Sequence, residues 1–153
     1  MSQQRIDKAN YYLDIAETVL ERSTCLRRRY GAIIVKNDVI VSTGYNGAPR
    51  GRANCIDRDN CLRDQLGIPS GERYELCRSV HAEANAIIAA SRENMLGATL
   101  YLAGYDRQGL IAAECCSMCR RLIINAGIQR VICRVEPRQY TVTRVKDWLA
   151  DEN

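Results

Sequence analysis

A strand–helix–strand pattern in the second half of the chain restricts its fold more than any other feature. Residues 98–103 and 129–134 are short apolar segments typical of strands, and residues 116–126 between them have helical spacing that ends at Gly127. Two strands joined through a helix lie parallel in one sheet. The pattern therefore predicts an α/β domain with helices on both faces of the sheet.

Apolar periodicity also predicts the remaining elements. They are helices at 5–22, 81–93 and 141–151, the last with Val142, Val145 and Leu149 facing inward, and a β-hairpin with strands at 32–35 and 39–41. Residues 44–80 are a long polar segment rich in glycine and proline, and residues 104–114 are a second polar loop. Loops as long as the first usually serve a function. We expect one domain, 1–153, because domains usually have about 100–200 residues.

Composition and charge exclude several classes of protein. The first residues lack the apolar core of a secretory signal, and no apolar run approaches the ~20 residues of a membrane helix. We therefore expect a cytoplasmic protein without a membrane partner. The net charge is +4 and the one dense basic run is Arg27-Arg28-Arg29, so no nucleic-acid partner is expected. In a cytoplasmic chain, clustered cysteines such as those among the eight here are expected to be metal ligands or catalytic groups and not disulfides. Cys133, inside a predicted strand, is expected to be a core residue.

One histidine and two cysteines have the spacing of metal ligands. His81 begins one predicted helix, and Cys116 and Cys119 lie on one face at the start of another. A helix N-terminus favours the thiolate, which is the form that binds metal. Three protein ligands leave the fourth position of a tetrahedral zinc ion open for water, as in catalytic zinc sites.

Glu83 follows His81 by two residues and is expected to lie beside the metal without binding it. A carboxylate there can take a proton from a water that zinc has made acidic. His-x-Glu followed by Cys-x-x-Cys is the pattern of zinc-dependent nucleobase deaminases. A redox dithiol is the alternative for Cys116 and Cys119, but it leaves His81 and Glu83 without a role.

From about Ala9 to Val131 the sequence resembles the deoxycytidylate (dCMP) deaminases of the zinc cytidine deaminase superfamily. The segments that carry the resemblance are 31–35, 43–51, 77–87, 116–119 and 123–128. His81-x-Glu83 and Cys-x-x-Cys are common to the superfamily, whereas Gly-Tyr-Asn-Gly-x-Pro at 44–49 is typical of the deoxycytidylate branch. The resemblance implies a three-layer α/β/α fold with a mixed sheet of five strands.

The resemblance also implies a reaction. Zinc held by His81, Cys116 and Cys119 would activate a water that attacks C4 of cytosine, and Glu83 would carry the proton to N3 and then to the leaving amine. The products from dCMP would be ammonia and dUMP, which feeds thymidylate synthesis. The alternative within the superfamily is a different cytosine, adenine, guanine or pteridine-type substrate.

The resemblance suggests substrate contacts as well. Asn46 resembles the family residue that hydrogen-bonds the sugar, and Ala82 is a further expected contact. Arg27, Arg28 and Arg29 are candidates for the 5′-phosphate because of their position before the first strand. A solvated charged turn is the alternative for these arginines.

Regulation and assembly are also implied by the resemblance. Many family members bind dCTP as activator and dTTP as inhibitor near residues 44–51, and Mg²⁺ would accompany such a triphosphate. The expected effector loop comprises Tyr45, Gly47, Pro49 and Arg50. A plain turn is the alternative, since glycine, proline and asparagine make turns regardless of function. A homo-oligomer, from dimer to hexamer, is expected.

Some family members carry a second, structural zinc built partly from cysteines at positions like Cys25 and Cys55. The chain offers four thiols for a closed tetrahedral site: Cys25, Cys55, Cys61 and Cys77. Their spacing is not diagnostic, so four half-buried thiols without metal are the alternative.

The sequence departs from the family pattern at three places. Cys115 stands where the family usually has proline, and it lies near enough to Cys119 to compete with Cys116 as a ligand. Residues 104–114 are longer than in the shorter members, and the tail after Pro137 matches poorly. A zinc-stabilised binding module without catalysis is a third functional alternative, with Cys115 as fourth ligand, and such a module would not need Glu83.

Overall fold

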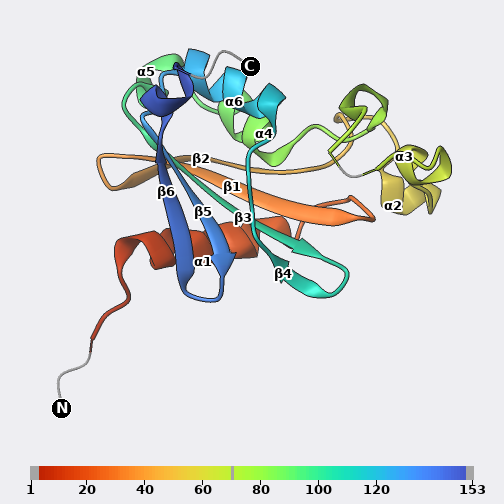
Figure 1. Cartoon of the computed structure of the whole chain (residues 1–153), viewed down its shortest axis with the longest axis horizontal. Helices are drawn as coiled ribbons and strands as arrows, with labels where there is room; N and C mark the ends of the chain where they lie inside the picture. The colour runs from red at the N-terminus through yellow and green to blue at the C-terminus, as the bar shows by residue number, and fades with distance from the viewer. Residues whose placement is uncertain (1–3, 70, 151–153) are drawn as a thin grey trace.

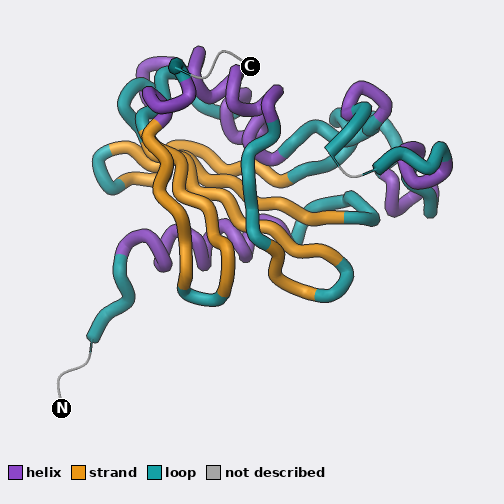
Figure 2. Tube along the Cα trace, viewed as in Figure 1, coloured by secondary structure: helices purple, strands orange, loops and turns teal. Residues whose placement is uncertain are grey.

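The computed structural model describes residues 4–69 and 71–150, with a mixed sheet at its centre (Figures 1 and 2). The strands are β1 (Arg28–Lys36), β2 (Val39–Tyr45), β3 (Thr99–Asp106), β4 (Gly109–Ile111), β5 (Arg130–Glu136) and β6 (Gln139–Arg144). Five of them lie in the order β2-β1-β3-β5-β6, and β4 pairs with β3 outside this path. β3 and β5 are parallel, and the other pairs are antiparallel. The predicted five-stranded mixed sheet is confirmed, with one short additional strand.

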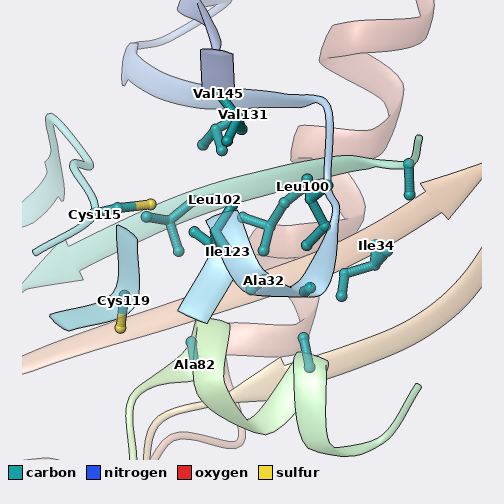
Figure 3. Close-up of a cluster of buried hydrophobic side chains, with 14 of the residues drawn as sticks. Ala32, Ile34, Ala82, Leu100, Leu102, Cys115, Cys119, Ile123, Val131 and Val145 are labelled. Carbon is teal, nitrogen blue, oxygen red and sulfur yellow. The ribbon is translucent and has the colours of Figure 1, made fainter. Parts of the chain in front are cut away.

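Helices cover both faces of this sheet. One face carries α1 (Lys8–Leu20), and the other carries α4 (Ala82–Ile88), α5 (Arg92–Met95) and α6 (Ser117–Ala126) (Figure 1). Side chains alternate along β1, so Ala32 and Ile34 join the core under α4 and α6 (Figure 3), whereas Ile33 packs against α1. The three-layer α/β/α arrangement is thus confirmed. Within the described ranges, no helix has the length and apolar character needed to cross a membrane.

Gly44 allows α4 to pack directly on β2. A Cβ atom at Gly44 would lie 2.4 Å from both the carbonyl oxygen of Ala82 and the amide nitrogen of Ala86, so a side chain there would push the helix away. We expect Gly44→Ala to lower the free energy of unfolding by about 1–3 kcal/mol, the usual cost of overpacking. The control is Thr43→Ala, at an exposed position of the same strand. Equal stabilities of the two variants in urea unfolding would contradict this packing.

The long segment between β2 and α4 is folded at one end of the sheet (Figure 1). It contains α2 (Cys55–Arg58), α3 (Leu62–Gln65) and the 3-10 helix η1 (Tyr74–Leu76). Its two ends are joined, because the amide of Gly47 donates to the carbonyl of Val80 at 3.2 Å and the amide of Val80 donates to Gly47 at 2.7 Å. The loop predicted over 44–80 is therefore a closed, partly helical segment that begins only after β2 ends.

The helix predicted at 141–151 is wrong, and residue 151 lies outside the described residues. Instead, β6 turns back from β5 and pairs with it in an antiparallel hairpin, which is followed by a single 3-10 turn, η2 (Val145–Trp148). The β-branched run at 141–143 favours this strand. Of the three residues predicted to face inward, only Val145 is buried. The structure exposes the other two, Val142 and Leu149.

Two smaller predictions also differ from the structure. The helix predicted at 81–93 is interrupted, since α4 ends at Ile88 and the Ser91 hydroxyl caps α5 by accepting from the amide of Asn94. Serine competes for backbone hydrogen bonds and therefore favours a helix start over a helix interior. The loop predicted at 104–114 includes the β3–β4 hairpin.

Candidate metal centre and active site

The residues predicted to bind metal converge between the starts of two helices. His81 is the N-cap of α4, Cys116 is the N-cap of α6, and Cys119 follows in the first turn of α6. The His81 Nδ1 atom is 3.5 Å from Sγ of Cys116 and 3.4 Å from Sγ of Cys119. All three ligand atoms lie within 4.8 Å of one another, and the described residues contain no other such group of histidine, cysteine and acidic side chains.

These separations fit a zinc ion. Zinc binds cysteine sulfur at about 2.3 Å and histidine nitrogen at about 2.1 Å, and tetrahedral angles then place nitrogen and sulfur about 3.6 Å apart. The two distances from His81 are close to this value. The side chains are therefore arranged as three ligands of one tetrahedral ion.

The two cysteines are prepared for metal in different ways. The hydrogen bond from the Cys119 thiol, together with the His81 ring, lowers the pKa of Cys116. The same bond raises the pKa of Cys119, because that thiol donates its proton. A divalent cation between the two sulfurs would take the place of this proton, since metal binding releases protons from its ligands.

Glu83 lies in the first turn of α4 and faces the same pocket as His81 and Cys116. It is 4% exposed, and this burial raises the pKa of its carboxyl group. A carboxyl group in such a position can accept a proton and pass it on. The structure thus places a buried carboxyl group beside the three candidate ligands, at the position that the sequence predicts.

The pocket at this site has a cavity volume of about 80 Å³, and three arginines line it: Arg27, Arg28 and Arg63. Arg29 is not among them. Successive side chains of a strand point to opposite faces, so Arg28 faces the pocket while Arg29 lines a separate hollow against α1. Only Arg27 and Arg28 of the three predicted phosphate contacts are therefore brought to the site.

Asn46 lines the pocket, but its side chain is largely engaged within the protein. Its Oδ1 accepts hydrogen bonds from the Ser23 hydroxyl at 2.6 Å and the Tyr30 amide at 2.8 Å, and its Nδ2 donates to the Arg28 carbonyl at 2.9 Å. These bonds fix the start of β1 to the end of β2. Asn46 therefore holds the backbone of Arg28 in place. The sequence does not predict this role, because the hydrogen-bond partners of Asn46 are 16 to 23 residues away along the chain.

The remaining predicted substrate and effector residues lie outside the pocket wall. Ala82 is fully buried against β2. The four residues of the predicted effector loop do not line the pocket either: Tyr45, Gly47, Pro49 and Arg50.

The four cysteines proposed for a second zinc lie in one region without forming a compact set. Cys25, Cys61 and Cys77 line the pocket, and Cys55 is buried close by. Burial raises the pKa of the Cys55 thiol, and the other three thiols add to the shift. Their sulfurs are not all within 4.8 Å of one another, unlike the ligand atoms at His81.

Cys115 does not compete for the metal. Its side chain is 4% exposed, and its thiol interacts with that of Cys133, a core residue of β5 as predicted, which raises the pKa of Cys115. The candidate ligand pair is therefore Cys116 and Cys119, and Cys115 does not belong to the same compact group.

Five pocket residues were missed from the sequence: Tyr30, Arg63, Tyr74, Ser79 and Glu114. Tyr30 lies in β1, and the other four come from loops or short helices with no periodic pattern, so no sequence signal identified them. Two buried polar atoms of the pocket wall, Nη1 of Arg27 and Oγ of Ser79, have no hydrogen-bond partner in the described part of the chain. Such atoms are costly unless a ligand or water satisfies them.

Comparison with known proteins agrees with this geometry. The family profile described as "Cytidine and deoxycytidylate deaminase zinc-binding region" matches residues 6–135. A deoxycytidylate deaminase of Mycobacterium phage D29 is 40% identical over 133 residues, which are 84% of this chain and 94% of the relative. The Schizosaccharomyces pombe deoxycytidylate deaminase is 32% identical over 80% of this chain, and this match spans only 35% of the yeast protein.

A solved structure is similar along most of the chain. The dCMP deaminase of cyanophage S-TIM5, crystallised with dCMP and dUMP, aligns with a TM-score of 0.58 and 26% identity over 84% of this chain and 82% of the phage chain. The family profile covers most of the sequence, including all three metal ligands and Glu83. The chain therefore belongs to the cytidine and deoxycytidylate deaminase family that carries this zinc-binding region.

Proposed function

We propose that the protein is a zinc-dependent hydrolase that deaminates dCMP to dUMP and ammonia, supplying dUMP for thymidylate synthesis. The observation that carries the proposal is the tetrahedral spacing of His81, Cys116 and Cys119 with buried Glu83 beside them in one pocket. The deoxycytidylate deaminase of Mycobacterium phage D29, and the cyanophage enzyme crystallised with dCMP and dUMP, support this choice of substrate.

The chain's own residues have distinct roles in this reaction. Zinc, when bound, supplies a water whose pKa is lowered to about 7. His81, Cys116 and Cys119 would hold the ion at the starts of α4 and α6, and His81 and Cys116 line the pocket that the substrate would enter. Glu83 would take one proton from the attacking water and give it to N3 of cytosine. It would then take the proton of the hydroxyl group added at C4 and give it to the amine, which leaves as ammonia while the C4 carbonyl forms.

Arg27 and Arg28 provide the positive charge for the 5′-phosphate. The unpartnered Nη1 of Arg27 offers a donor that a phosphate oxygen would satisfy. We propose that the second amide hydrogen of Asn46 binds the deoxyribose, because among the described residues Nδ2 donates only to the Arg28 carbonyl.

The phosphate contact is tested by comparing dCMP with deoxycytidine. Loss of a hydrogen bond to a charged group costs about 1.5–3 kcal/mol, so we expect Arg27→Ala to lower kcat/KM for dCMP by about 10–100-fold and to leave deoxycytidine unaffected. Arg29→Ala, on the other face of β1, is the matched control and should change neither substrate. An equal loss on both substrates would contradict a phosphate role, and turnover of a different base alone would move the assignment to another member of the superfamily.

We also propose the second zinc at Cys25, Cys55, Cys61 and Cys77, which requires these side chains to rotate toward a common centre. Metal analysis of the purified protein is expected to give two zinc ions per chain, with one lost in Cys55→Ser and the other in Cys119→Ser. One zinc per chain, unchanged by Cys55→Ser, would rule out the second site.

Regulation and assembly complete the proposal. We propose that dCTP with Mg²⁺ activates and dTTP inhibits through the segment that contains Tyr45, Gly47, Pro49 and Arg50, in a cytoplasmic homo-oligomer. Because these residues lie outside the pocket, effector binding there would leave the substrate site free. Initial rates with and without each triphosphate, together with the molar mass in solution, test this part.

A further inference from the structure

Arg63 is buried to an extent that is rare for an arginine. It lies in α3 and is 6% exposed. Its Nε donates to the carbonyl of Glu72 and its Nη2 donates to the carbonyl of Pro69, both at 3.1 Å. The guanidinium group thus fixes the backbone that leads into η1.

A chain of ring contacts connects Arg63 to the metal site. Its guanidinium carbon lies 4.6 Å from the centroid of the Tyr74 ring. The Tyr74 ring in turn meets the His81 ring edge to face, with centroids 5.0 Å apart and planes at 90°. This is a preferred geometry for two aromatic rings, so the position of Tyr74 restricts the plane of the His81 ring.

We propose that Arg63 is a positioning residue that acts through Tyr74 to hold the His81 ring with Nδ1 toward the sulfurs of Cys116 and Cys119. Arginine suits this role better than lysine, because its planar group bonds two carbonyls while its face lies on the tyrosine ring. Groups that orient a histidine ligand typically contribute 10–100-fold to metal affinity or activity. The proposal rests on zinc at this site, but not on dCMP as the substrate.

The test measures zinc release from the zinc-loaded full chain to a chelating dye. If zinc is released in more than one kinetic phase, the phase that is absent in His81→Ala reports release from this site. We expect Arg63→Gln and Tyr74→Leu each to speed this phase by about 10-fold. The double variant should release zinc no faster than Tyr74→Leu alone, because Arg63 acts through that ring. Tyr74→Phe keeps the ring and should match the wild type.

Arg73→Gln is the matched control, since this neighbouring arginine is exposed and pairs with Glu75. It should leave zinc release unchanged. Unchanged release in Arg63→Gln, or effects of Arg63→Gln and Tyr74→Leu that multiply in the double variant, would overturn the proposal. If Arg63→Gln does not fold, Arg63→Lys is measured in the same way. Because zinc release needs no substrate, failure here is distinguishable from failure of the proposed dCMP activity.

Discussion

Replacing Glu83 with glutamine is expected to abolish most turnover of dCMP while the protein keeps its zinc. Glutamine fills the same buried space but cannot accept or deliver a proton, and general acid–base groups typically contribute about 10²–10⁴-fold to a rate. Glu83 is not one of the three candidate ligands, which are His81, Cys116 and Cys119, so the metal site itself should persist. Single-turnover rates with dCMP and the zinc content of the same sample check both parts.

Glu93→Gln is the control for this variant, because it makes the same exchange in the first turn of α5 at an exposed position. It should retain full activity. Full turnover by Glu83→Gln would show that the proton passes through another group. Loss of zinc together with activity would instead make Glu83 a structural part of the metal site and contradict its assigned role.

Replacing Arg134 with methionine is expected to lower the free energy of unfolding by about 3 kcal/mol. Arg134 is 2% exposed on the α1 face of β5, where it forms ion pairs with Asp14, at 2.7 Å, and Glu17 and donates to Oδ1 of Asn10 at 2.8 Å. Breaking a buried pair from one side usually costs about 3–5 kcal/mol. The lower end applies because Asp14 and Glu17 still reach solvent. Methionine preserves the apolar stem of the side chain, so the loss reports the guanidinium group.

Arg138→Met is the matched control for Arg134. Arg138 also pairs with Asp14, at 3.5 Å, but its side chain is 64% exposed. Exposed pairs contribute about 0–1 kcal/mol, so this variant should unfold at nearly the wild-type urea concentration. Equal losses in the two variants would contradict the view that Arg134 joins the central sheet to α1.

The sequence predicts the sheet and the metal site well because both depend on local patterns. Continuous apolar runs mark β1 and β3, and Cys-x-x-Cys after His-x-Glu places the candidate ligands at two helix starts. The prediction of a final helix is wrong because two patterns overlap in this segment. Residues 141–149 fit helical spacing, but the β-branched residues 141–143 fit a strand equally well. The segment forms a strand because it pairs with β5, and the spacing of residues in the sequence does not show this pairing.

The pocket wall is harder to predict than its centre. Arg28 and Arg29 are adjacent residues of the same type, so the sequence does not show which of them faces the pocket. The alternation of side chains along β1 places Arg28 in the pocket and Arg29 on the other face. The roles of Asn46, Arg63 and Tyr74 depend on contacts between distant parts of the chain, which no local pattern encodes. The packing role of Gly44 also depends on such a distant contact. The sequence places Gly44 at the start of a turn-rich segment, whereas in the fold it lies in β2 against α4.

The most direct measurement is the formation of dUMP and ammonia from dCMP by the zinc-loaded protein. We expect the two products in equal amounts, loss of both after a chelator removes the zinc, and recovery when zinc is restored. A protein that holds zinc at His81, Cys116 and Cys119 and yet forms no dUMP would contradict the proposed function.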